Sequence, residues 1–164
     1  MKPAKPPETL GFFHPITLTA TWFGAGLLPG APGTWGSLAA LPFAWGITLT
    51  AGPWGLLICA CGIFIAGCWA AALYTRAAGL KDCQHIVIDE VAGQWLALCF
   101  VPLDPFAYFS AFLLFRAFDI FKPWPANLAD RALSGGFGIM LDDVIAGVYA
   151  ALALHAGLYA LSLL

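Results

Sequence analysis

The sequence has 164 residues, of which 61% are hydrophobic and only 10% are charged, and its mean hydropathy is +0.84. Soluble domains are about half apolar and about one quarter charged, so this composition excludes an ordinary soluble domain. The formal net charge of −2, without any basic cluster, also excludes nucleic acid as a partner.

The first half of the chain is almost free of charge. Residues 1–13 form a tail that lacks the apolar core and cleavage site of a signal peptide. Residues 14–33 are apolar but interrupted by Gly and Pro, which favours an interfacial or re-entrant segment over a span. No Asp, Glu, Lys or Arg occurs between Thr9 and Thr75, which leaves room for two spans of about 20 residues. We therefore predict one membrane-embedded domain over residues 1–164.

Five apolar helices are predicted, and together they form an all-α, polytopic membrane bundle. They cover residues 36–51, 54–75, 86–101, 105–121 and 143–163. Pro42 lies inside the first helix and predicts a kink or a late start there. The first two helices are expected to form one hairpin through "AGP", and the next two another through "VPLDP".

This arrangement predicts that the charged residues gather on one side of the membrane. The tail and the loops 76–90 and 122–142 share that side, whereas Asp104 alone lies opposite. All seven Lys and Arg fall on the charged side, or in the case of Arg116 within about a turn and a half of it. The positive-inside rule then places the charged face in the cytoplasm and the C-terminus outside.

Two acidic pairs each precede an apolar run: Asp89 with Glu90, and Asp142 with Asp143. One interpretation is helix capping and a favourable contact with the helix dipole, but this requires a single carboxylate per helix. Together with Asp119, five carboxylates converge on one patch, where they repel one another unless a cation lies among them. Carboxylates beside a phosphate are the ligands that Mg²⁺ prefers. The two pairs are therefore predicted metal ligands, and all five acids are predicted catalytic residues.

Basic residues accompany the acids at the end of the fourth helix. Arg116, Asp119 and Lys122 recur every three residues, and Arg131 follows in the next loop. One interpretation is that the three cations reach out to lipid headgroups. Because Arg116 lies within an apolar helix, we prefer a second interpretation, in which the cations neutralise a substrate phosphate.

Three further residues are candidates for this site, and Thr34 among them is a predicted phosphate-binding residue. Thr34 and Ser37 lie where the first helix begins, so they either cap that helix or offer hydroxyl groups to a phosphate. His85 precedes Asp89 by four residues on the charged side and is a candidate base.

Four segments resemble the phosphatidylglycerophosphatase A family in order and spacing: "PGAPGTWGSLAALP", "DCQHIVIDEVAGQW", "LLFRAFDIFKPWPANLADR" and "GGFGIMLDDVIAGVYAAL". The resemblance runs from about Gly24 to Ala151. It implies a Mg²⁺-dependent phosphatase of the bacterial inner membrane that converts phosphatidylglycerol phosphate into phosphatidylglycerol and inorganic phosphate. The family blocks fall on Thr34, Asp82, Asp89, Glu90, Arg116, Asp119, Lys122, Pro123, Asp142 and Asp143.

The expected mechanism is attack on the terminal phosphate by a metal-activated water, or alternatively by an aspartate. Asp119 acts as the base or completes the metal shell. Arg116 and Lys122 stabilise the charge on the phosphoryl oxygens, and Arg131 is an additional candidate for this role. Two rival functions are a small membrane ion transporter, which places its carboxylates near the membrane midplane, and a CDP-alcohol-type phospholipid enzyme. Only the Gly138-x₃-Asp142 fragment of the latter's signature occurs here. The sequence gives no indication of the oligomeric state.

Overall fold

The computed structural model describes residues 5–80, 83–126 and 135–163, and within these ranges the chain forms helices and no strands. The short helix α1 (Pro15–Ala20) and the 3₁₀ turn η1 (Ala25–Leu27) come first. They are followed by α2 (Pro32–Ala78), α3 (Ile88–Ala97), α4 (Pro105–Phe121) and α6 (Gly135–Ser162). The all-α prediction is confirmed.

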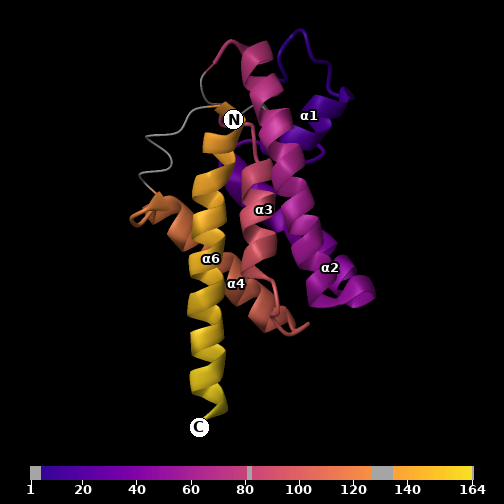
Figure 1. Cartoon of the computed structure of the whole chain (residues 1–164). Coiled ribbons are helices and arrows are strands. Elements are labelled where there is room, and N and C mark those ends of the chain that lie inside the picture. Colours follow the sequence, from indigo (N-terminus) through magenta and orange to yellow (C-terminus); the bar gives the residue numbers. More distant parts are fainter. Residues whose placement is uncertain (1–4, 81–82, 127–134, 164) are drawn as a thin grey trace.

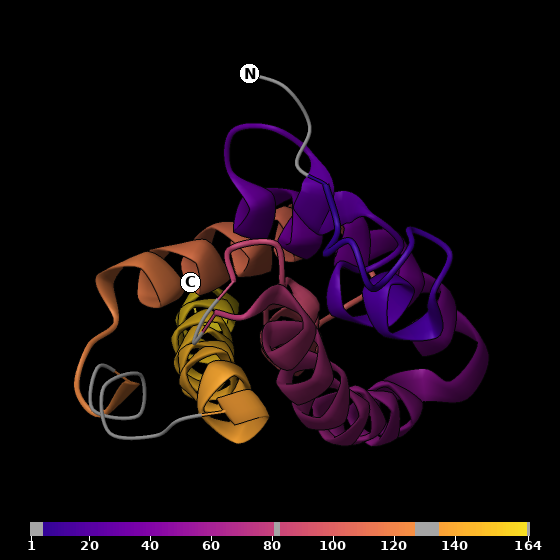
Figure 2. The same cartoon turned by 90° about the horizontal axis from the view of Figure 1, so that it is seen from above.

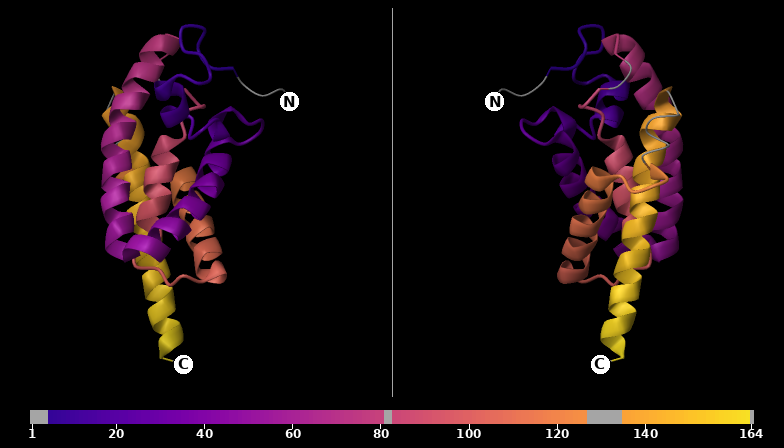
Figure 3. Two further views of the ribbon diagram at one scale, coloured as in Figure 1. Left: turned by 90° about the vertical axis from the view of Figure 1, so that its right-hand side faces the viewer. Right: turned by 90° about the vertical axis from the view of Figure 1, so that its left-hand side faces the viewer.

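The first two predicted helices are the two segments of α2, which meet at a sharp bend. Gly52 has φ 70° and ψ −176°, a conformation that glycine adopts without steric cost, and Pro53 follows it. The segments 32–51 and 53–78 therefore run in opposite directions, as Figures 1 and 3 show. The expected late start does not occur, because the helix begins at Pro32 and continues through Pro42.

Helix α3 is shorter than predicted and lies inside the bundle. Its ten residues extend about 15 Å, half of the roughly 30 Å hydrocarbon core of a bilayer. It packs against α2, α4 and α6 (Figure 2). Most of its side chains are buried. Among the helices of the described ranges, α2 and α6 are long and apolar enough to cross a membrane, which indicates membrane association. The bundle of five spans stays a prediction.

The two ends of the bundle differ, as Figures 1 and 3 show. The N-terminal segment, the α2–α3 connection and the start of α6 lie at one end. The bend of α2 and the α3–α4 turn lie at the other, and the C-terminal part of α6 projects beyond them. The described parts of the tail and of the 76–90 connection therefore lie at the same end as the start of α6, whereas residues 127–134 of the predicted 122–142 loop lie outside the described ranges.

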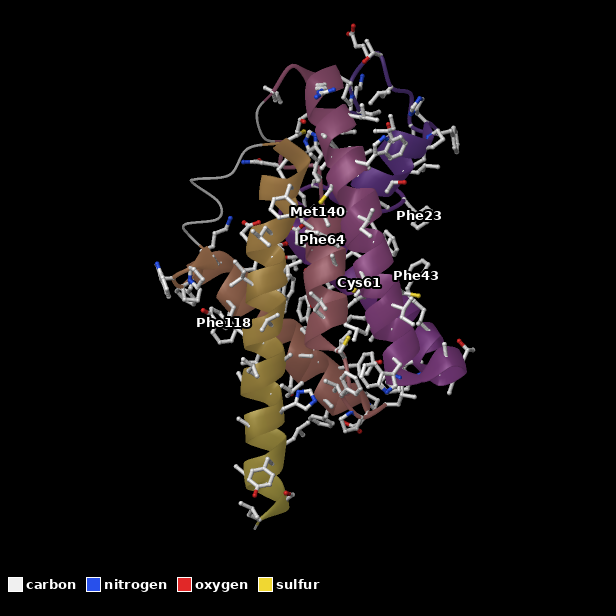
Figure 4. The ribbon with its side chains drawn as sticks, viewed as in Figure 1. Phe23, Phe43, Cys61, Phe64, Phe118 and Met140 are labelled. Atoms are coloured by element: carbon white, nitrogen blue, oxygen red, sulfur yellow. The ribbon has the colours of Figure 1, made fainter. Side chains whose placement is uncertain are left out.

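Small residues allow the helices to approach closely in the interior. Gly93 of α3 faces Gly147 of α6: a Cβ on Gly93 would lie 2.5 Å from the carbonyl oxygen of Asp143, and one on Gly147 would collide with the carbonyl oxygen of Gly93. Nearer the start of α6, Met140 (Figure 4) fills the space against Gly67 of α2, where a Cβ would lie 2.6 Å from the Met140 sulfur. Such contacts between small residues are typical of helices that associate in membranes.

The Gly93–Gly147 contact predicts the effect of one added methyl group. Gly147→Ala should lower the free energy of unfolding by about 1–3 kcal/mol, because the new Cβ meets backbone that cannot rotate away. Gly157→Ala is the matched control on the same helix, where a Cβ meets nothing within 4 Å, and it should leave stability unchanged or raise it by up to about 1 kcal/mol. Thermal unfolding in detergent measures both. Equal stability of the two variants would contradict the close contact.

Candidate functional site

Four helices bring their polar residues to one place in the bundle. Asp89 and Glu90 lie in the first turn of α3. Asp142 and Asp143 lie inside α6 rather than at its start, because that helix begins at Gly135 and not at residue 143. The earlier start follows from packing, since Gly136 is helical and lies so close to α2 that a Cβ there would collide with the carbonyl oxygen of Cys68.

The capping interpretation of the acidic pairs is therefore wrong for α6, and α3 offers it little support. The N-cap residue of α3 is Val87, which makes no side-chain capping hydrogen bond. Within the first turn of α3, the backbone N–H of Glu90 donates to Oδ1 of Asp89 at 3.0 Å. The acidic pairs therefore contribute to the carboxylate cluster and do not act as caps of the helices.

Three of the carboxylates form a group that fits a cation. One oxygen each from Asp89, Glu90 and Asp143 lies within 4.8 Å of the other two. Oε2 of Glu90 is buried and has no hydrogen-bond partner in the described ranges. A buried acceptor without a donor is costly, and three hard oxygen ligands in one place are a donor set that suits Mg²⁺. The residues therefore fit the metal that the sequence predicts.

The fourth predicted ligand, Asp142, lies beside this group but pairs with a lysine. Its Oδ2 is 2.5 Å from Nζ of Lys122, the residue that ends α4. Asp142 is still close enough to Asp89 and Asp143 to interact with them electrostatically. The structure thus brings all four predicted ligands together, and it divides them into a group of three and a neighbouring ion pair.

Arg116 connects the acids of α3 and α4. Its Nη1 is 2.5 Å from Oδ2 of Asp119, one turn farther along α4, and 3.8 Å from Oε1 of Glu90. The arginine side chain is only 15% exposed, so these ion pairs are poorly screened by solvent. Asp119 in turn interacts with Asp143. Arg116 therefore links the predicted base to the predicted metal ligands.

The acids on α3 lie among other acids. Glu90 is close enough to Asp143 and Asp119 for their charges to repel it, and Arg116 offsets this repulsion only in part. Asp89 likewise lies close to the carboxylates of Glu90 and Asp142. The cations of the described residues therefore do not fully compensate the acids, and a further cation would favour their charged forms.

The N-terminus of α2 completes the cluster through Gly33. A Cβ at this position would collide with Oε1 of Glu90 and lie 2.9 Å from Nη1 of Arg116. Thr34 follows in the same first turn, and Ser37 is buried and donates to the carbonyl oxygen of Gly33 at 2.9 Å. The N-cap residue is Ala31 and makes no side-chain hydrogen bond, so the capping interpretation of Thr34 and Ser37 is wrong.

Of the remaining predicted residues, only His85 is described, and it is not joined to the cluster. His85 lies in the α2–α3 connection, where its Nδ1 is 3.6 Å from Sγ of Cys83, and it does not belong to the group of three carboxylates. Asp82 and Arg131 lie outside the described residues.

Sequence reasoning missed the residues that make the cluster possible. Gly33, Gly93 and Gly147 allow close contact. The signal for Gly93 and Gly147 was a glycine four residues after Asp89 and again four residues after Asp143. Gln94 was also missed, although a lone amide in an apolar helix, four residues after Glu90, is a recognisable signal.

An apolar groove lies apart from these charges. It has a volume of about 400 Å³ and is lined by residues of the N-terminal segment and of α2, among them Phe23 and Phe43 (Figure 4), whose rings stack with centroids 6.0 Å apart. Its lining contains no charged side chain. It therefore suits hydrocarbon, and the reactive chemistry belongs to the acidic cluster.

Comparison with known proteins places the chain among lipid phosphatases. Residues 18–158 match the family model described as phosphatidylglycerophosphatase A. The phosphatidylglycerophosphatase A of Escherichia coli is 42% identical over 141 residues, which cover 84% of this chain and 80% of that protein. The Haemophilus influenzae protein of the same name is 39% identical over 152 residues, covering 92% and 93%.

A third relative carries another name. A Bacteroides thetaiotaomicron protein, provisionally named a phosphatidylinositol-3-phosphatase, is 38% identical over 144 residues, which cover 84% of this chain and 89% of that protein. No solved structure matches the chain.

Proposed function

Because the chain belongs to the phosphatidylglycerophosphatase A family and is a phosphatase, we propose that its substrate is phosphatidylglycerol phosphate. The products are phosphatidylglycerol and inorganic phosphate, which makes this the last step of phosphatidylglycerol synthesis. Family membership removes the ion transporter and the CDP-alcohol-type enzyme as alternatives. The observation that carries the proposal is the cluster of three carboxylates flanked by Arg116 and Lys122.

A lipid with a terminal phosphate suits the place where this cluster lies. The substrates in the relatives' names are all lipids whose headgroup carries a phosphate monoester, and they differ in the headgroup itself. Large apolar side chains are exposed on the outer surface, such as Trp54, Ile58 and Ile65 on α2 and Leu152 on α6. We therefore expect the acyl chains to stay among lipids while the phosphate enters the cluster.

The membrane arrangement that we propose is multi-pass, in the inner membrane of a bacterium. The two segments of α2, together with α4 and α6, form the wall of the bundle, and α3 fills its interior. The end that carries the N-terminal segment and the α2–α3 connection faces the cytoplasm, because the Lys and Arg residues are concentrated toward it in the sequence.

Asp89, Glu90 and Asp143 are the residues that we expect to hold Mg²⁺. When bound there, the ion supplies positive charge to the phosphate and lowers the pKa of a water molecule. Asp142 lies at the edge of this site, where it holds the ammonium group of Lys122 in place. Its role is therefore to orient Lys122 as well as to add negative charge beside the metal ligands.

Arg116 and Lys122 bind the phosphate in this proposal. Nε of Arg116 is buried and finds no hydrogen-bond partner among the described residues, so it is a donor for a phosphate oxygen. Lys122 approaches from the end of α4 as a second positive charge. Thr34 lies in the first turn of α2, where its hydroxyl and the free backbone N–H groups favour an anion. These groups compensate the charge that develops on the phosphoryl oxygens.

Asp119 is the proposed base for the attacking water. Its carboxylate is held by Arg116 and lies beside Asp143, so it is oriented toward the metal ligands. Asp119 takes a proton as the water oxygen forms its bond to phosphorus. The bond between phosphorus and the headgroup oxygen breaks, and that oxygen leaves as the alcohol of phosphatidylglycerol after taking up a proton.

Removing one metal ligand tests this mechanism. Asp143→Asn should reduce phosphate release from phosphatidylglycerol phosphate in detergent micelles by at least about 100-fold in the presence of Mg²⁺. Excess EDTA should reduce the wild-type rate to a similar level. Asp104→Asn is the matched control at the opposite end of the molecule, where the side chain caps α4 and Asn caps equally well.

Two results would contradict the mechanism. Full activity of Asp143→Asn, or of the wild-type protein in EDTA, would exclude the metal and its proposed ligands. A folded wild-type protein that releases no phosphate under any condition would exclude the substrate.

The orientation in the membrane has its own test. Alkaline phosphatase fused after the last residue should be active, because that enzyme matures only outside the cytoplasm and the C-terminus is expected there. The same enzyme inserted in the α2–α3 connection should be inactive. The reverse pattern would show that the charged end faces outward.

A further inference from the structure

Gln94 is a buried polar residue of α3 whose presence the fold does not explain. Its side chain is 0% exposed, and neither Oε1 nor Nε2 has a hydrogen-bond partner among the residues that the structure describes. It follows Glu90 by four residues, so it lies on the same face of α3, one turn deeper in the bundle. Figure 1 shows α3 at the centre of the helices.

An amide without partners at this position costs the folded protein free energy. Both of its polar groups have lost their water, and an apolar side chain of similar shape would avoid that loss. Gln94 is not the only such residue, because within the described part of the chain Oε2 of Glu90 and Nε of Arg116 are also buried without hydrogen-bond partners. Polar groups left unsatisfied beside a reactive cluster indicate a missing binding partner.

The chemistry of the amide restricts what this partner is. A phosphate oxygen only accepts hydrogen bonds, so it would pair with Nε2 and repel Oε1. A metal ion would pair with Oε1 and leave Nε2 without a partner. A hydroxyl oxygen both donates and accepts, and it satisfies the two ends of the amide together.

We propose that Gln94 binds a hydroxyl group of the substrate headgroup and thereby selects for it. This inference rests on the proposed function, which places the terminal phosphate at the acidic cluster. The glycerol of phosphatidylglycerol phosphate carries a free hydroxyl next to that phosphate. One turn of α3, about 5.4 Å, separates Gln94 from Glu90, which is a suitable distance for a group next to the phosphate. A buried water molecule is the other source of the same O–H chemistry.

The test compares Gln94→Met with the wild-type protein on two lipids. Phosphatidylglycerol phosphate has the headgroup hydroxyl, whereas phosphatidic acid carries its phosphate monoester without one. The substitution should lower kcat/KM for phosphatidylglycerol phosphate roughly 10- to 100-fold. It should change kcat/KM for phosphatidic acid much less, so the selectivity ratio between the two lipids falls.

A stability measurement separates binding from a structural role. Gln94→Met should unfold at the same temperature as the wild-type protein or at a higher one, because it removes an unsatisfied amide. Thr75→Val is the control, since it deletes a buried hydroxyl that does have a partner, the carbonyl oxygen of Ala71 at 2.9 Å. This control should keep full activity on both lipids.

Each outcome decides a different point. Equal losses on both lipids would assign the hydroxyl to a bound water rather than to the headgroup. Unchanged kcat/KM on both lipids, or a marked fall in the unfolding temperature of Gln94→Met, would overturn the inference. A wild-type protein that is inactive on phosphatidylglycerol phosphate would instead count against the proposed function, and the stability comparison would still show whether the amide is satisfied within the fold.

Discussion

The constraint on which this protein depends is the burial of many carboxylates beside few cations. Five carboxylates (Asp89, Glu90, Asp119, Asp142 and Asp143) meet around Arg116 and Lys122 at the junction of four helices. Taking charged groups out of water is costly unless opposite charges accompany them. The ion pairs of Arg116 and Lys122 compensate part of this charge, and the remainder favours a bound divalent cation and its phosphate ligand. In this account, the charge of the cluster is balanced only when the cation and the phosphate are bound.

Close contacts between backbones hold the acids at these positions. Gly93 and Gly147 let α3 and α6 touch, and each lies one turn from an acid, Asp89 and Asp143 respectively. Gly33 allows a similarly close approach at the N-terminus of α2, which contacts Glu90 and Arg116. In lipid the hydrophobic effect cannot drive one helix against another, so close packing of small residues must take its place. The same glycines that stabilise the bundle therefore fix the spacing of the carboxylates.

Composition and charge were enough to predict the class of the fold and the members of the cluster. The convergence of Asp89, Glu90, Asp119, Asp142 and Asp143 followed from helix hairpins that bring charged loops to one end. The start of α6 was misplaced because the run from Gly135 to Gly138 reads as a loop by local propensity, whereas packing on α2 makes it helical. Gln94 escaped notice because the sequence does not show whether a polar side chain is satisfied. That property depends on the neighbours supplied by other helices.

The most direct test of this account is the unfolding temperature of the purified protein as free Mg²⁺ is raised at constant ionic strength. A cation that binds the folded cluster must stabilise it, so the wild-type unfolding temperature should rise with Mg²⁺. Asp143→Asn should be more stable than the wild-type protein without metal, because it removes one buried charge, and it should respond little to Mg²⁺. A wild-type unfolding temperature that is independent of Mg²⁺, or an equal rise in both proteins, would contradict the claim that this acidic cluster is a metal site.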